Sequence, residues 1–423
     1  MVDRRFLPVG HGGFAVEKHR NGKEDYNLVF DCGSTKSYGE KRDNAAEKQI
    51  PKVFQQGEKI DKLFISHLHV DHLNGVPCLL EHCRVEHIYL PYLTPEEKIL
   101  SLMELCWGDL LDRPTEPEVQ EMTTDGPLEN REAADERRGP LFGKERTLRL
   151  CQQLLSGQTD AQMFGETEVH RVYTSEQAEL FAGKNNDILF AGINQKTDIK
   201  SENQIPLTNG PAGPGEWLLI PCTYCGMERS KQFRALLKER QISINDLLWE
   251  MMGSKFWRDR RKKTAYYELY QSYKAIRPNI NETTMTVFSG TSSEDVSQYL
   301  YKRGECYSYT PKDKRVFYPA GCLYMGDYPA RGREYWEDLC RAYGGVWRRI
   351  GVFTLPHHGS QYNHNANMIS SSACYVVQGG VEDAHHPHET VLASLEGKKA
   401  EYYCVNELEQ TEAHFRVCAD RDL

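Results

Sequence analysis

The stretch FISHLHVDHLNG, residues 64–75, constrains this chain more than any other part of its sequence. It places three histidines and an aspartate within six positions, directly after the short apolar run DKLFIS. Such a run predicts a buried strand, and the helical spacing of DHLNGVPCLLEH predicts a helix after it. The polar cluster is therefore expected in a turn that leads from a strand into a helix.

The spacing within this cluster is typical of a metal site. His67 and His69 alternate by two on an extended segment, so both side chains point to one side and can bind one cation. Asp71 and His72 follow at the turn into the helix and can bind a second cation nearby. Neutral imidazole and carboxylate suit zinc, manganese or iron. A polar loop rich in histidine by chance would not explain the strand before the cluster or the Gly75 turn after it.

Two later motifs also place candidate ligands at the ends of apolar runs. CLYMGD puts Asp327 after a predicted strand, where one carboxylate can bridge two cations. FTLPHHGS does the same with His357 and His358. An aspartate after glycine is usually a turn residue and paired histidines are often at the surface, but the shared position at strand ends favours one common site. Which of His357 and His358 binds the metal stays open.

Strand-like and helical stretches alternate at both ends of the chain, which predicts an α/β fold with one long insert. Residues 1–95 and 216–423 are expected to form the two halves of one domain. Residues 96–215 between them are expected to be an insertion that is partly mobile, because stretches such as TEPEVQEMTTDGPLENREAADERRGP are charge-rich and poor in large apolar residues.

The order of the motifs resembles that of metallo-β-lactamase-fold hydrolases. More narrowly, the chain resembles the metallo-β-lactamase-like domain of the competence protein ComEC over residues 1–95 and about 280–423. The resemblance is carried by VGHGG, FDCGS, NETTMTVFSG, LYMGD, HHGS and AHHPHETVL. It implies a four-layer αββα metallo-β-lactamase sandwich with a long, mostly helical insertion, and two zinc ions as cofactor.

Further site residues follow from the resemblance. Asp71 is expected both to bind metal and to orient the attacking hydroxide. His386 resembles a late active-site histidine that can contact a phosphate or protonate a leaving group. The alternative is a turn in which Pro387 is the first residue of a helix. Ser360 offers a hydroxyl to a substrate oxyanion, and Asn281 stands where ComEC-like members have an asparagine.

The chain departs from the family pattern at two points. The family's GQGD loop has His11 and Gly13 in place of its Gln and Asp, so no role is carried over to that loop. The third histidine motif of β-lactamase-like enzymes is not visible, and Asn281 or His170 in EVHRVY could stand in its place. With fewer protein ligands for the first metal, a single ion or Mn²⁺ is an alternative to two zinc ions.

A metal pair lowers the pKa of bound water to about 7 and so supplies hydroxide at neutral pH. The resemblance implies a phosphodiesterase or nuclease, with a nucleic acid or nucleotide as substrate. The stretch KFWRDRRKKTAYYELYQSY, residues 255–273, interleaves basic and aromatic residues that suit phosphates and stacked bases. An amphipathic helix with a solvated basic face is the alternative. A formal net charge of −9 argues mildly against tight nonspecific DNA binding.

Two other functions remain open. One is hydrolysis of a carboxylic ester, lactone or phosphocholine-type ester, with the insertion as a lid. The other is a weakly active scaffold or sensor subunit of a bacterial system, such as antiviral defence, that binds protein partners through residues 96–215. A cytoplasmic protein without a membrane segment is expected, since neither a secretory signal nor a long apolar run is recognisable. The 13 cysteines without framework spacing favour reduced thiols.

Overall fold

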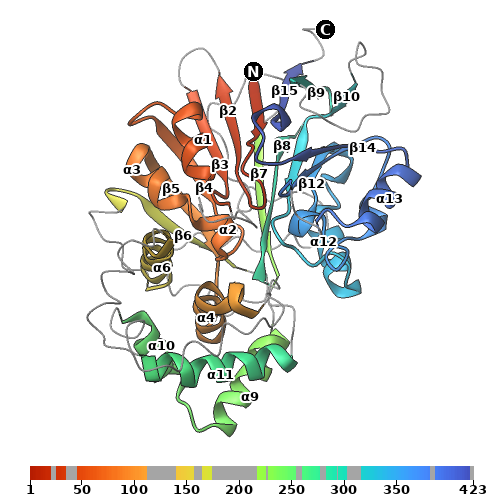
Figure 1. Cartoon of the computed structure of the whole chain (residues 1–423). Helices are drawn as coiled ribbons and strands as arrows, with labels where there is room; N and C mark the ends of the chain where they lie inside the picture. The colour runs from red at the N-terminus through yellow and green to blue at the C-terminus, as the bar shows by residue number, and fades with distance from the viewer. Residues whose placement is uncertain are drawn as a thin grey trace.

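The computed structural model describes residues 1–20, 25–34, 45–111, 140–156, 164–173, 217–224, 227–253, 260–276, 283–292, 294–302, 316–381 and 386–419. These residues form two β-sheets with helices packed against them (Figure 1). The mixed α/β class expected from the sequence is therefore confirmed.

The first sheet has nine strands within the described residues, in the order β10-β9-β15-β1-β2-β3-β4-β5-β6. The strands β3 to β6 are parallel to one another, whereas β1, β2 and β15 pair antiparallel. Strand β15 comes from the far end of the chain and lies between β1 and β9. The bounds are β1 Val2–Phe6, β2 Ala15–Arg20, β3 Asp25–Phe30, β4 Lys59–Phe64, β5 Arg84–Pro91, β6 Glu168–Val172, β9 Val296–Lys302, β10 Phe317–Pro319 and β15 Ala413–Ala419.

The second sheet has the order β14-β13-β12-β11-β8-β7 in the described part of the chain. The strands β11 to β14 are parallel, and β7 and β8 are antiparallel. Every residue of β7 and β8 is buried, as expected for strands covered on both faces. The bounds are β7 Trp217–Thr223, β8 Met285–Thr291, β11 Gly321–Tyr324, β12 Ile350–Thr354, β13 Cys374–Gln378 and β14 Glu401–Val405.

Helices flank both sheets, and none in the described part of the chain is long and apolar enough to cross a membrane. Helices α1 to α11 belong with the first sheet, and α12 and α13 with the second (Figure 1). The bounds are α1 Ala45–Val53, α2 Val70–Leu73, α3 Val76–His82, α4 Pro95–Leu111, α6 Pro140–Ser156, α9 Met227–Glu239, α10 Ile244–Met252, α11 Arg260–Ile276, α12 Arg333–Tyr343 and α13 Glu389–Gly397.

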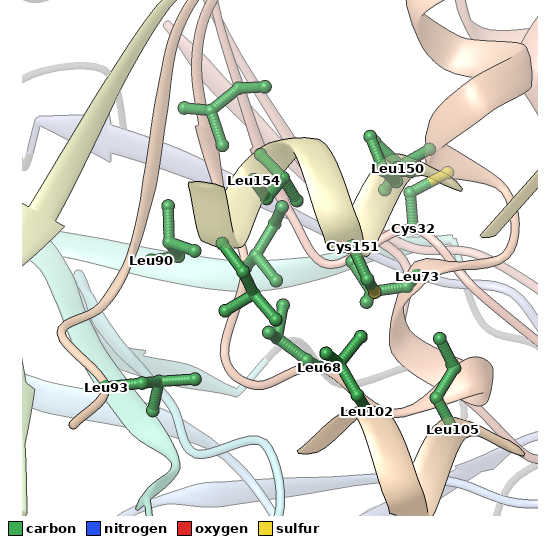
Figure 2. Packing of buried hydrophobic residues seen from close by; sticks show 14 of the residues in the cluster. Cys32, Leu68, Leu73, Leu90, Leu93, Leu102, Leu105, Leu150, Cys151 and Leu154 are labelled. Carbon is green, nitrogen blue, oxygen red and sulfur yellow. The ribbon is translucent and has the colours of Figure 1, made fainter. Parts of the chain in front are cut away.

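Three buried apolar clusters hold these layers together. The first joins the first sheet to the helices around it, the second combines side chains of both sheets, such as Phe64 and Val352, and the third joins the second sheet to α12 and α13. The first cluster also fixes the histidine turn, because Leu68 and Leu73 are buried in it beside leucines of α4 and α6 (Figure 2).

Part of the predicted insertion, residues 96–215, belongs to the first sheet. Strand β6 pairs in parallel with β5, and α4 and α6 contribute to the first apolar cluster. The expectation of a mostly helical insertion did not include this strand, because EVHRV is a run of only five residues with just two apolar ones, Val169 and Val172. The remaining residues of the segment, 112–139, 157–163 and 174–215, lie outside the described residues, and the expected mobility concerns these residues.

Candidate metal centre

His67 and His69 lie in the turn after β4, with His69 as the N-cap of α2, and Asp71 and His72 lie in this short helix, as the sequence predicts. The loop VGHGG and the loop FDCGS pack directly against it. The backbone N–H of Gly13 donates to the carbonyl of Asp71 at 3.1 Å, and that of Cys32 donates to the carbonyl of His72 at 3.0 Å. A Cβ on Gly33 would lie 2.4 Å from the Asp71 carbonyl oxygen, so only glycine fits this approach.

The first group of candidate ligands consists of His67, His69 and Asp327. One ligand atom of each lies within 4.8 Å of the others. The Nε2 atom of His67 is 3.3 Å from Oδ2 of Asp327, and the ring centroids of the two histidines are 4.4 Å apart. Asp327 is 1% exposed and follows β11, whereas His67 follows β4. The two sheets therefore meet at this group.

The second group combines Asp71, His72 and His358 with the same Asp327. The Nε2 atom of His72 is 3.3 Å from Oδ1 of Asp327 and 3.5 Å from Oδ2 of Asp71. The Nε2 atom of His358 is 2.9 Å from Oδ2 of Asp71. Asp327 thus presents Oδ2 to the first group and Oδ1 to the second, which is the geometry of a carboxylate that bridges two cations.

The outer ring nitrogens fix the tautomers of these histidines. His358 donates its Nδ1–H to the carbonyl of Gln378 at 2.7 Å, because a carbonyl can only accept. His72 donates its Nδ1–H to Oδ2 of Asp31 at 2.8 Å. The hydroxyl of Ser66 donates to the same oxygen and is 3.0 Å from Nδ1 of His67. Such outer partners orient histidines whose inner nitrogen binds a metal.

The inner nitrogens of His67 and His72 differ from that of His358 in their hydrogen bonding. The buried Nε2 atoms of His67 and His72 make no hydrogen bond of good geometry with any described residue. The lone pair on Nε2 of His358 faces an oxygen of Asp71 at 2.9 Å, so this contact needs a second ring proton or a cation. Nitrogen and carboxylate ligands that converge in this way fit zinc, manganese or iron.

The charge state of the site also suits a cation. Burial acts to raise the pKa of Asp71 and Asp327, but the surrounding histidines outweigh it and hold the pKa of both carboxyls well below their usual range. Burial and the neighbouring His67 hold the pKa of His69 well below its usual value, which keeps this ring neutral. Burial lowers the pKa of His72, but the nearby carboxylates raise it well above its usual value, so without a cation this ring holds a second proton, which a bound metal would displace.

Residues 20–104 match the model of the metallo-beta-lactamase superfamily. The matched segment runs from the last residue of β2 into α4 and contains the whole histidine cluster. It does not include Asp327 or His358, which are distant in sequence and lie beside the matched segment only in the folded chain. Members of this superfamily are typically metal-dependent hydrolases. No curated protein matches the sequence.

Of the pair left open by the sequence, His358 is the residue that lies among the candidate ligands. It is 5% exposed and belongs to the candidate ligand groups with Asp71 and with Asp327. His357 is half-buried, and its Nε2 atom lies farther out, 3.8 Å from Oδ2 of Asp327. Its Nδ1 atom is 3.0 Å from Oδ1 of Asn363, which holds the ring at the rim of the site.

The remaining predicted residues differ in their positions. His386 lies at the rim, with its ring stacked 5.5 Å from that of His357. Helix α13 starts at Glu389 with His388 as its N-cap, so Pro387 is not its first residue. Ser360 is 3% exposed, and its hydroxyl accepts from the backbone N–H of the residue two positions later, so it stabilises the turn after the histidine pair. Asn281 lies outside the described residues.

Sequence reasoning gave no role to His11, which the structure places beside the candidate ligands. The ring of His11 lies 3.8 Å from that of His358, and its Nε2 atom is 4.0 Å from Oδ2 of Asp71. Its position between the glycines of VGHGG, in the loop that the family pattern singles out, was the available signal. His170 joins neither group around Asp327 and instead lies beside His87.

Proposed function

We propose that this protein is a metal-dependent hydrolase that cleaves phosphodiesters. The observation that supports it most directly is Asp327, whose two oxygens face ring nitrogens of His67 and His72 on opposite sides. A metal pair bound between these groups would supply an acidified water as nucleophile and neutralise charge on the attacked group. The protein's own residues must then hold the pair, bind the substrate and handle protons.

Two sets of residues would bind the two metal ions. His67 and His69 would bind one ion, Asp71, His72 and His358 the other, and Asp327 both. Asp31 and the carbonyl of Gln378 keep the outer proton on His72 and His358, which leaves the inner lone pairs for the metals. The identity of the ions as zinc rests on the ligand types alone.

The rim of the site favours an anionic substrate. His11, His357 and His386 form a partly exposed group, in which the ring of His386 lies 5.5 Å from each of the other two. Imidazoles at this position can donate hydrogen bonds to phosphate oxygens, and His386 can pass a proton to a leaving oxygen. A neutral carboxylic ester would make less use of three such donors. This supports a phosphodiester over the ester or lactone alternative.

A nucleic acid as substrate rests on the narrower resemblance to ComEC. The stretch 255–273, which suggested stacked bases, forms α11 from Arg260 onward. Tyr270 and Tyr273 on this helix are fully buried in the first apolar cluster, so neither ring offers a platform for a base. The packing of these tyrosines favours the alternative of an amphipathic helix. Small nucleotides and single strands are therefore substrates of equal interest.

The proposal is tested by measuring metal content and cleavage together. Asp71→Asn and Asp327→Asn should lower the metal content and abolish cleavage of bis-(p-nitrophenyl) phosphate, because each removes a charge between the ring nitrogens. Single-stranded DNA, double-stranded DNA and cyclic dinucleotides would be compared in zinc and in manganese. Asp3→Asn is a matched control, since Asp3 contacts His414 and Arg416 away from the site.

Three results would count against the proposal in different ways. Bound metal with cleavage of esters or lactones, but not of phosphodiesters, would favour the second enzyme class. Absence of both metal and cleavage would favour the scaffold or sensor subunit, with protein partners as the next question. Equal cleavage by wild type and both variants would mean that the site lies elsewhere.

A further inference from the structure

A second cluster of metal-binding side chains lies away from the candidate centre, on the last two strands of the first sheet. It consists of His87 on β5 with Glu168 and His170 on β6. The two strands are parallel and place His87 directly opposite Glu168, while His170 lies two positions farther along. Because side chains at alternate positions of a strand share a face, all three point to the same side of the sheet.

The distances between their polar atoms match those of a zinc site. Nδ1 of His87 lies 3.2 Å from Nε2 of His170 and 3.2 Å from Oε2 of Glu168, and the third distance, from His170 to Glu168, is 3.5 Å. Ligand atoms bound tetrahedrally to zinc at about 2.1 Å are about 3.4 Å apart. One cation can therefore contact all three atoms without a change of backbone.

The surroundings of these three side chains affect how well they could bind a cation. The ring of His170 stacks on Tyr89 with centroids 4.8 Å apart, which fixes its orientation. His170 and His87 are partly buried, whereas Glu168 is exposed and can bring its negative charge to the cation from solvent. Lys62 on β4 lies opposite His87, and its ammonium is directed to the Tyr89 hydroxyl at 3.4 Å. This positive charge would weaken the site but not block it.

We infer that His87, Glu168 and His170 form a zinc site separate from the hydrolytic centre. Two imidazoles and one carboxylate leave a fourth position for water or another ligand. The ion would link the edge strand β6 to β5 and so stabilise the edge of the first sheet. This inference does not depend on the hydrolase proposal, because none of the three residues belongs to the ligand groups around Asp327.

Zinc stoichiometry and affinity test the inference. Metal-free protein would be titrated with Zn²⁺ against a chromophoric chelator and, separately, with Co²⁺, whose visible spectrum reports tetrahedral ligands. Wild type should bind one equivalent more than Glu168→Gln or His170→Gln. Each substitution should weaken this equivalent about 100-fold or more, since even partners of metal ligands contribute 10- to 100-fold. Phosphodiester cleavage should be unchanged in both variants.

Two controls separate this site from other binding. His414→Gln removes a histidine of the same sheet that also contacts a carboxylate, but lies in no candidate ligand group, and should keep all equivalents. Asp327→Asn should keep the equivalent that Glu168→Gln loses. The inference is overturned if Glu168→Gln and His170→Gln bind as many zinc ions as wild type with the same affinity. Because Glu168 is exposed, its substitution leaves the fold intact and the result interpretable.

Discussion

At the scale of single residues, the candidate centre depends on side chains that do not themselves face the metals. Asp31 is the main example, because one of its oxygens accepts from both His72 and Ser66 and the other accepts from the backbone N–H of Ser66. Asp31 adopts a left-handed backbone conformation, with φ of 54°. Strained backbone conformations are concentrated at functional sites, and the three donors that this carboxylate accepts from indicate that Asp31 orients His72 and Ser66.

Asp31→Asn should weaken metal binding about 10- to 100-fold, the usual effect of losing an outer partner. The amide can donate, so it no longer forces the proton of His72 onto Nδ1. Asparagine tolerates the left-handed conformation, so the backbone should not change. The measurement is metal affinity by competition with a chelator. Asp61→Asn is the control, because Asp61 is a buried aspartate of β4 outside the site, and this variant should bind metal like wild type. Equal weakening of metal binding in both variants would instead show a general loss of stability.

Site residues that are close together in the sequence could be predicted more fully than those that only the fold brings together. His67, His69, Asp71 and His72 lie within one turn, so their spacing alone predicts that they converge. The choice of His358 over its neighbour depends on a turn with two left-handed residues, which no spacing rule reveals. His11, Asp31 and Ser66 gain their roles only when three loops meet.

At the scale of elements, the site forms where the loops after several strands lie so close to one another that no side chain fits between their backbones. The loop after β3 passes so close to α2 that a Cβ on Gly33 would overlap the backbone of Asp71. The buried Leu68 and Leu73 hold the other side of the turn in the first apolar cluster. The polar residues between them are therefore directed away from the helices and toward the second sheet.

Gly33→Ala should both destabilise the protein by about 1–3 kcal/mol and lower its metal affinity, because the overlap displaces the turn that carries Asp71 and His72. Urea unfolding and metal titration would measure the two effects. Gly345→Ala is the matched control, since a Cβ there meets nothing within 4 Å and the expected change is within about 0.5 kcal/mol. A stable Gly33→Ala variant with normal metal binding would contradict the packing described here.

Whether a segment is a strand or a helix was easier to predict than which neighbouring strand it pairs with. The apolar runs ending at Phe64, Tyr324 and Thr354 are strands, as their composition indicates. The strand β6 was missed because it has only five residues, of which two are apolar, and its pairing with β5 is a contact across some eighty residues of chain. Sequence periodicity reports which face of a segment is buried but not which neighbour buries it.

At the scale of the whole molecule, a buried ion pair connects the two sheets. Arg4 on β1 and Glu17 on β2 are 2.7 Å apart and fully buried. The guanidinium of Arg4 also donates to the carbonyl of Ser289 in the second sheet, and the hydroxyl of Tyr324 donates to Glu17. Burial acts to raise the pKa of Glu17, but Arg4 outweighs it and lowers the pKa to about 2.

This pair should make stability fall in acid. Because the pKa of Glu17 is lower in the folded state than the usual 4.5, its contribution is present above about pH 4.5 and is lost as the pH falls toward 2. Glu17→Gln should cost about 3–5 kcal/mol at pH 7, since it leaves Arg4 charged and buried. Urea unfolding at pH 7 and at about pH 2.5 measures both effects. Glu412→Gln, which breaks the partly exposed pair with Arg5, should cost about 1 kcal/mol or less.

The position of β15 has a consequence for synthesis of the chain. Strand β1 is made first, but its second neighbour, β15, is made only when residues 413–419 emerge. Until then one edge of β1 has unpaired backbone groups, and unpaired strand edges favour aggregation. Asp327 and His358 also emerge long after His67. Synthesis that stops after His358 but before β15 would thus give a product with every ligand of the candidate centre but an unfinished sheet.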